Sequence, residues 1–319
     1  MSKPRSRKRI AQILGIVRVA LAILIVVAVV NIVRILMDYN KSDTLYKDTS
    51  SKYTSTTYDI NEIYETAQSS EDVAGLSEET GIAESSITPT DDEMADSSSE
   101  VTSPAPSMPW YQMISVDLES LQAVNSDIIG WIYFENEEIS YPILYSGDND
   151  TYLYTSYTGQ SMSAGSIFLE RTNSPDFTDR HTIIYGHNMK NLSMFGRLRY
   201  YRQSGYYSSH KYFQIITNGA RYRYQIVAYK EVLETDSLYT TYFASDEAYA
   251  QFINEQILAG PSIGLSEYTS AIEAMQTNLA HRVQGGGDAT TLPRIVTLST
   301  CTTTGKRFTV SAVRVDVAN

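Results

Sequence analysis

The chain contains a single cysteine, Cys301, which ends the strand-like run 295–301. One thiol cannot form a disulfide within the chain, and a lone cysteine at the end of a predicted strand is a candidate nucleophile. The alternative is a buried structural thiol, because free cysteine is among the most buried residue types. Side chains alternate along a strand, so Cys301 shares a face with Thr297 and Ser299, and this polar face favours the nucleophile.

Two further residues are placed to react together with this thiol. Of the four histidines, His187 directly follows a strand-like run and Gly186, a position from which an imidazole can line a cleft. Arg307 lies six residues after Cys301, on the polar face of the next strand. The alternatives are a histidine in a surface turn and a solvated arginine at a strand end. The other histidines are predicted to be surface residues: His181, His210 and His281.

A β-rich domain is expected to position these side chains. An apolar stripe after Asp117 predicts a short helix near 118–124, and Ser245 begins a second helix, over 246–258. A third helix is predicted over about 267–280. Eight strand-like runs with short connections predict a mainly β fold, a closed or nearly closed eight-stranded barrel. The runs are 128–134, 139–145, 165–169, 181–185, 212–217, 222–229, 295–300 and 308–315.

The N-terminal third differs from this domain. Residues 1–9 are strongly basic, and residues 10–37 form an apolar run long enough to span a bilayer. No small-residue cleavage site follows the apolar core, so a signal anchor is predicted rather than a cleaved signal peptide. The positive flank predicts a cytoplasmic N-terminus, with the rest of the chain on the outer side of the cell membrane.

Residues 38–109 are rich in serine, threonine and acidic residues. Positions 39–108 hold fifteen acidic and three basic residues, a balance of −12 that equals the formal net charge of the whole chain. Low hydrophobicity with high net charge predicts disorder, and such a linker would hold the folded domain, 110–319, well off the membrane. The acidic composition therefore says little about the ligand of the folded domain.

Three motifs together resemble the sortases, and among them class B, cysteine transpeptidases of the Gram-positive cell surface. They are Tyr185-Gly-His187-Asn-Met, Thr297-Leu-Ser-Thr-Cys301 and Arg307-Phe-Thr-Val310. The likeness covers 115–315, with the supporting stretches 125–131, 141–142, 148–153, 165–168 and 193–196. By this resemblance, the expected fold is the eight-stranded sortase barrel.

The resemblance also implies a reaction and a role for each residue. Cys301 would attack the carbonyl of a threonine in a sorting signal and form a thioacyl-enzyme, His187 would protonate the leaving amine and deprotonate the incoming one, and Arg307 would stabilise the oxyanion. A free thiol is only a few per cent thiolate at neutral pH, so a neighbouring imidazolium matters. A fixed cation at the oxyanion contributes ~3 kcal/mol. The implied substrate-binding residues are Asn149, Leu153, Ser299 and Thr300.

Two segments depart from the family pattern. The loop after the nucleophile, 302–306, is short and lacks an acidic residue that some relatives carry there, which leaves the acidic orienter of His187 open. The stretch 260–292 is long for class B and is expected to cover or gate the substrate groove.

The implied partners are surface proteins with a C-terminal sorting signal, of the Asn-Pro-x-Thr-Asn or Ser/Pro-Pro-x-Thr-Gly type, and an amine of peptidoglycan. The alternatives are a pilin-polymerising sortase, another cysteine peptidase or L,D-transpeptidase, and a catalytically silent wall-binding scaffold. No His or carboxylate spacing indicates a metal, no cofactor is expected, and no basic patch indicates nucleic acid.

Overall fold

The computed structural model describes residues 5–57, 108–259, 292–301 and 305–319. The chain divides into two compact units, one made of 1–54 with 116–319 and the other of 55–115. The predicted helix over 267–280, most of the acidic segment and the start of the loop after Cys301 lie outside the described residues.

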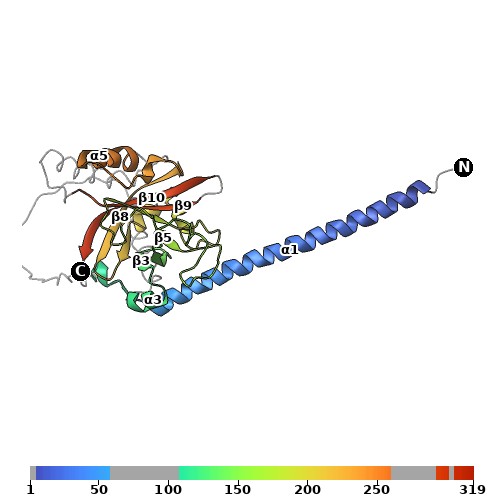
Figure 1. Cartoon of the computed structure of the whole chain (residues 1–319), viewed down its shortest axis with the longest axis horizontal. Helices are drawn as coiled ribbons and strands as arrows, with labels where there is room; N and C mark the ends of the chain where they lie inside the picture. The colour runs from blue at the N-terminus through green and yellow to red at the C-terminus, as the bar shows by residue number, and fades with distance from the viewer. Residues whose placement is uncertain (1–4, 58–107, 260–291, 302–304) are drawn as a thin grey trace, which may run out of the picture. The chain divides into compact units, whose positions relative to one another are not determined.

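Eight strands of the first unit close into one barrel, as the sequence predicts (Figure 1). Around the barrel the strands follow the order β10-β8-β7-β3-β4-β5-β6-β9. The pairs β4/β5 and β6/β9 are parallel and the other pairs are antiparallel. The strands are β3 (Ile128–Phe134), β4 (Ser140–Leu144), β5 (Ile167–Leu169), β6 (His181–Tyr185), β7 (Tyr212–Ile216), β8 (Arg221–Leu233), β9 (Ile295–Cys301) and β10 (Lys306–Ala318).

Short helices flank the barrel, and two of them were predicted. α3 (Leu118–Val124) begins at Asp117, whose Oδ1 accepts a hydrogen bond of 3.0 Å from the Ser120 backbone N–H. α5 (Asp246–Phe252) is capped by Ser245 and continues as the π-helical turn η4 (Ile253–Ile257). The remaining helical turns are η1 (Trp110–Gln112), η2 (Gly196–Arg202), α4 (Tyr206–Ser209) and η3 (Ser237–Tyr239).

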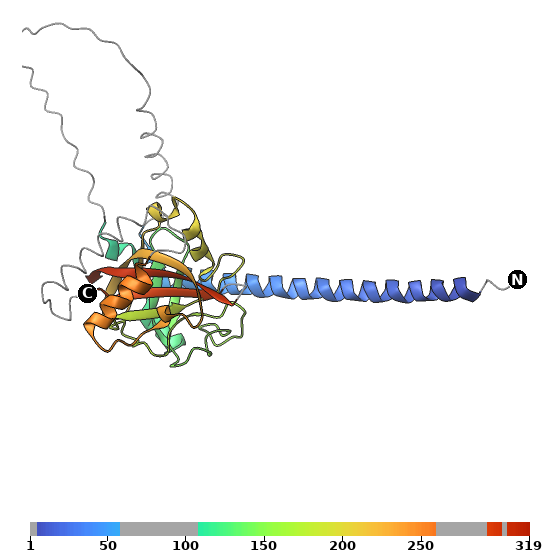
Figure 2. The ribbon, with the colours of Figure 1, turned by 90° about the horizontal axis from the view of Figure 1, so that it is seen from above.

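α5 and η4 lie on the outer face of the barrel. Tyr249, Ile253 and Ile257 are fully buried there in an apolar cluster with Val227 of β8 and Ile295 of β9 (Figures 1 and 2). Because Ile295 faces outward, alternation along β9 directs every second residue after it toward this same outer side. This face of β9 therefore carries the position of Cys301.

α1 (Arg5–Tyr53) extends beyond the predicted membrane anchor. From Leu14 it is long and apolar enough to cross a membrane, by length and composition. Its C-terminal part packs on the barrel, where Tyr46 is buried and its hydroxyl donates to the Gly165 carbonyl at 2.6 Å.

The prediction of disorder from residue 38 is therefore wrong for 38–53. Composition hides the helix, because its contact face is built from polar residue types spaced three or four apart, which bring them to one side. These residues are Asp38, Ser42, Tyr46, Thr49 and Tyr53.

Candidate active site

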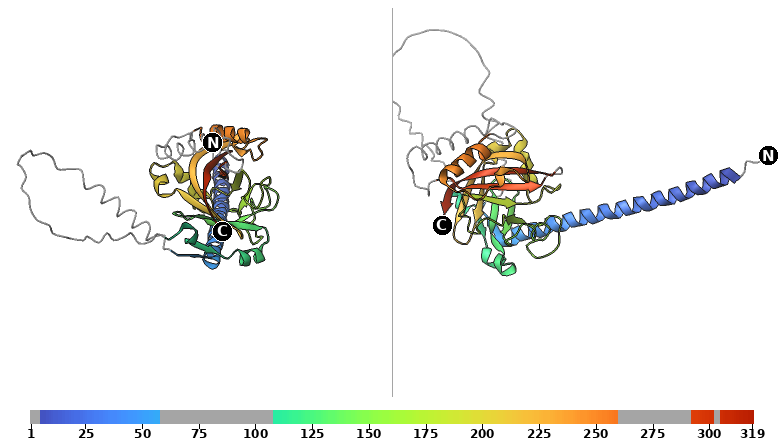
Figure 3. Two further views of the ribbon diagram at one scale, coloured as in Figure 1. Left: turned by 90° about the vertical axis from the view of Figure 1, so that its left-hand side faces the viewer. Right: turned by 45° about the horizontal axis from the view of Figure 1, so that its top comes forward.

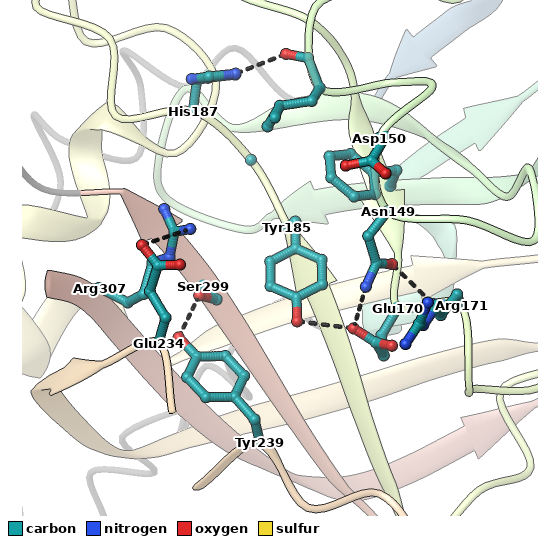
Figure 4. A pocket seen from close by; sticks show the side chains of 13 residues that line it. Asn149, Asp150, Glu170, Arg171, Tyr185, His187, Glu234, Tyr239, Ser299 and Arg307 are labelled. Carbon is teal, nitrogen blue, oxygen red and sulfur yellow. Dashed lines mark hydrogen bonds and ion pairs between the residues drawn. The ribbon is translucent and has the colours of Figure 1, made fainter. Parts of the chain in front are cut away.

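A cavity of about 420 Å³ opens at the end of the barrel where β6 and β9 finish and β10 begins (Figure 4). Its lining includes His187, Ser299 and Arg307 from that rim, and Asn149 and Leu153 from the loop after β4. Five of the seven residues implied by the sequence resemblance thus lie around one cavity.

The strand register aligns the three residues proposed for chemistry. β6 and β9 run parallel with Tyr185 paired to Ser299, so the backbone two positions further along each strand reaches His187 and Cys301. Across the antiparallel β9/β10 pair, Cys301 lies directly opposite Arg307. The backbone of these three neighbouring segments therefore brings His187, Cys301 and Arg307 to the same level of the rim.

His187 is held by the backbone of the neighbouring loop. Its Nε2 lies 2.6 Å from the Leu153 carbonyl oxygen, and since a carbonyl only accepts, Nε2 carries the proton and donates. In the neutral ring Nδ1 is then the basic nitrogen. Gly186 is required beside it, because a Cβ at that position would overlap with Ile167 and lie 2.7 Å from the Phe195 ring.

The surroundings of His187 favour its neutral form. Burial lowers the pKa of the imidazole from its ordinary value, and the nearby positive charge of Arg307 lowers it further. The hydrogen bond to the Leu153 carbonyl acts in the opposite direction, because it stabilises the protonated ring. Desolvation is the largest of these effects, so the imidazole is mainly uncharged at neutral pH.

Arg307 is paired with a carboxylate that sequence reasoning missed. Its Nη2 lies 3.2 Å from Oε1 of Glu234, the residue that follows β8, and both side chains line the cavity (Figure 4). Glu234 lies 73 positions before Arg307 in the chain, and the pairing of Leu233 with Lys306 in the β8/β10 ladder brings the two together. No local sequence pattern signals this contact.

A tyrosine from η3 closes the side of the cavity beside Ser299. The Tyr239 hydroxyl lies 2.8 Å from Ser299 Oγ, and its ring stacks on that of Tyr185 with centroids 6.4 Å apart. The hydroxyl of Tyr185 donates to Glu170 at 2.8 Å, and burial with that carboxylate raises the pKa of Tyr185.

Asn149 is oriented by hydrogen bonds at both ends of its amide. Nδ2 donates to Glu170 Oε2 at 2.7 Å, and Oδ1 accepts from the Arg171 backbone N–H at 2.9 Å (Figure 4). Asn149 and Leu153 lie in the turn-rich loop between β4 and β5. These two bonds leave one Nδ2 hydrogen of Asn149, which lines the cavity, for a further acceptor.

The comparisons with known proteins agree with this architecture. The family model of the sortase domain matches residues 138–315. Sortase B of Listeria monocytogenes is 37% identical over 193 residues, which cover 59% of this chain and 68% of that protein. Sortase B of Staphylococcus aureus is 28% identical over 204 residues, covering 63% and 75% of the two chains. The chain is a class B sortase.

Solved structures show the same fold for this sortase. A Staphylococcus aureus sortase B–substrate complex superposes with a TM-score of 0.51 at 28% identity, over 62% of this chain and 84% of that one. A Bacillus anthracis protein described as similar to sortase B gives a TM-score of 0.50 at 33% identity, over 62% and 82%.

Thr300 is placed differently from the other implied substrate residues. It pairs with Phe308 in the β9/β10 ladder and faces the side of β9 opposite Ser299. It is buried, and it is not part of the cavity lining. The geometry therefore argues against a direct contact between the Thr300 side chain and a substrate in this cavity.

His181 and His210 are buried in this sortase, so the prediction of surface positions is wrong for both. Nδ1 of His181 lies 2.8 Å from the Thr240 carbonyl and Nε2 lies 2.8 Å from Thr297 Oγ1, so each ring nitrogen has a partner. The partners of His181 come from distant segments, which is why its position at the loop–strand border misplaced it. His210 is buried by local contacts instead, because its ring stacks on that of Tyr206 and its Nδ1 lies 2.7 Å from the Tyr206 carbonyl oxygen. His281 lies outside the described residues.

The site shows no place for a metal ion among the residues that the structure describes. No three side chains of His, Cys, Asp or Glu in the described ranges are grouped as metal ligands.

Proposed function

We propose that this sortase cleaves a C-terminal sorting signal after threonine and transfers the acyl group to an amine of peptidoglycan. The observation that carries the proposal is the register that aligns His187, Cys301 and Arg307 across β6, β9 and β10. A thiol, an imidazole and a guanidinium at one cavity are a nucleophile, a proton carrier and an oxyanion partner.

The proposed sequence of steps uses one proton carrier. The Cys301 thiol transfers its proton to His187 and attacks the threonine carbonyl, and Arg307 donates hydrogen bonds to the resulting oxyanion. Collapse of this intermediate breaks the peptide bond, and the leaving amine takes the proton from His187. The acceptor amine then attacks the thioester, loses its proton to His187 and releases the thiolate. Because Nε2 is engaged with Leu153, we assign the proton exchange to Nδ1.

The substrate is proposed to bind along the wall that carries Asn149, Leu153 and Ser299. We assign the remaining N–H of Asn149 to a peptide carbonyl of the substrate, which is supported by an amide that Glu170 and Arg171 hold in place. Asn-Pro-x-Thr-Asn and Ser/Pro-Pro-x-Thr-Gly peptides are the signals to test. For localisation, we propose a single-pass protein with its N-terminus in the cytoplasm and the barrel outside, on the basis of the apolar part of α1.

The test follows cleavage of quenched peptides of both types by the full chain in detergent, with and without an added amine. Cleavage after threonine that disappears in Cys301→Ala and gives an amide product when amine is present supports the transpeptidase. Lysine side chains as the preferred acceptor would favour the pilin-polymerising alternative. A folded wild type with no cleavage of any peptide would favour the wall-binding scaffold.

A further inference from the structure

We propose that the cavity face of this sortase lies against the membrane surface, held there by residues 38–53 of α1 as a rigid stalk. The partner of this face is the lipid headgroup layer. The inference rests on the proposed membrane anchoring. It replaces the predicted long tether by a short, fixed distance between the membrane surface and the barrel.

The contacts of α1 with the barrel begin where its apolar run ends. The run ends at Met37, and the very next residue, Asp38, already contacts the barrel. Its Oδ2 accepts a hydrogen bond of 3.2 Å from the Ser163 backbone N–H and a second, short one from the Ser163 hydroxyl. The helix therefore has no spacer between the apolar segment and the catalytic domain.

The stalk is firmly attached to the barrel. Tyr46 donates to the Gly165 carbonyl, and its ring meets that of Tyr141 edge-on with centroids 5.5 Å apart. One turn further, Thr49 Oγ1 lies 2.8 Å from the Tyr157 hydroxyl oxygen. These contacts are buried, and they fix the rotation as well as the position of the helix on the barrel. A continuous helix that is docked in this way transmits its orientation to the domain.

The strands on either side of the acidic segment pair with each other. β1 (Thr54–Thr56) and β2 (Ile114–Val116) form a two-stranded sheet. The Thr57 backbone N–H donates to the Met113 carbonyl at 3.1 Å, and Thr57 Oγ1 donates to the Gln112 carbonyl at 2.9 Å. The chain thus leaves and returns at one place. The segment between these strands does not set the distance from the apolar helix to the barrel.

The order of the contacts along the stalk gives the domain its direction. Contacts along the stalk begin with Asp38 on Ser163, nearest the apolar segment, and end with the Tyr53 carbonyl on the Asp117 backbone N–H. Fifteen helical residues separate these ends, a distance of about 22 Å. The end of the barrel near Ser163 is therefore membrane-proximal, and the end near α3 is distal.

The cavity belongs to the proximal end. The Met162 backbone N–H, directly before Ser163, donates to the Tyr154 carbonyl at 3.0 Å. The carbonyl of the preceding residue, Leu153, is the acceptor of His187. β9 ends and β10 begins on the side of the barrel toward which the apolar half of α1 extends (Figures 1 and 3).

The test measures the heights of two sites above the bilayer, in full-length Cys301→Ala protein reconstituted in lipid nanodiscs. A fluorophore is attached through Tyr154→Cys, at a 57% exposed position next to His187, or through Glu119→Cys on exposed α3. Energy transfer to acceptor-labelled lipid headgroups is expected to place Tyr154→Cys about 20 Å nearer the surface. Equal transfer from the two positions overturns the proposal.

A matched variant separates the stalk from the apolar segment. Twelve Gly and Ser residues inserted between Met37 and Asp38 leave every docking contact intact but remove the rigid connection. This insertion is expected to abolish the difference between the two labels, and a difference that persists overturns the stalk. The measurement needs no activity, so it is independent of the proposed reaction. A chain that does not insert into the bilayer would refute the anchoring as well.

Discussion

Protonation of His181 is expected to set the acid stability of the barrel. The side chain is fully buried, and this burial lowers its pKa from 6.5 to about 4, against the opposing effect of the hydrogen bond to the Thr240 carbonyl. Since that carbonyl only accepts, Nδ1 donates and Nε2 accepts from the Thr297 hydroxyl. A second proton on this ring would be a buried charge with no carboxylate among its two partners.

The sign and size follow from the two pKa values. The folded pKa is lower than the unfolded one, so the unfolded chain binds more protons between pH 6.5 and pH 4. The stability that depends on a neutral His181 is therefore fully present above about pH 6.5, and it is lost as the pH falls toward 4. At about 1.4 kcal/mol per pH unit, the loss reaches about 3 kcal/mol near pH 4 and about 2 kcal/mol at pH 5.

The assay is urea unfolding of the full chain in detergent at pH 7.5 and pH 5, followed by the fluorescence of the buried Trp131. In His181→Gln the amide can replace both hydrogen bonds but cannot titrate, so this variant should lose about 2 kcal/mol less than the wild type. His210→Gln, which removes another buried histidine, is the matched control and should behave as the wild type. Equal losses in the wild type and His181→Gln would refute the reasoning.

Further predictions concern the cavity. Glu234→Gln removes the exposed partner of Arg307 and should lower kcat by about fivefold at most. Glu231→Gln breaks a similar ion pair outside the cavity and should leave kcat unchanged. Equal effects of the two substitutions would contradict a role of Glu234 in positioning Arg307. Arg307→Gln should shift the acid limb of the pH profile of kcat/KM to higher pH, because the positive charge of Arg307 lowers the pKa of His187. An acid limb at the same pH in both proteins would count against that coupling. Gly186→Ala should destabilise the fold by about 1–3 kcal/mol and shift Tm accordingly in a thermal melt, because its Cβ would overlap with neighbours; an unchanged Tm would show that these neighbours yield.

Local sequence patterns were sufficient for much of the fold. Alternating apolar residues located all eight strands, and Asp117 and Ser245 located the starts of two helices. These signals are local because a strand period or a helix cap involves residues within a few positions of one another. The candidate residues His187, Cys301 and Arg307 were likewise found from short motifs at the ends of strands.

Composition gave the wrong prediction for a segment that is ordered by its contact with the barrel. Residues 38–53 looked like part of a disordered acidic linker, yet Tyr46 and Thr49 pack on the barrel. Tyrosine, serine and threonine count as polar in any sum over a segment, but they bury well when a hydrogen-bond partner is present. That partner is supplied by a loop more than a hundred residues away.

The sequence by itself determined the strand-rich domain, the long apolar run near the N-terminus and the three residues proposed for chemistry. Only the tertiary structure decided that Glu234 pairs with Arg307, that Tyr239 meets Ser299 and that His181 is buried. The physical reason is that these contacts join segments distant in the chain, and the closed order and register of the barrel strands bring them together. A short motif carries the identity of a reactive residue, but its electrostatic surroundings come from the fold.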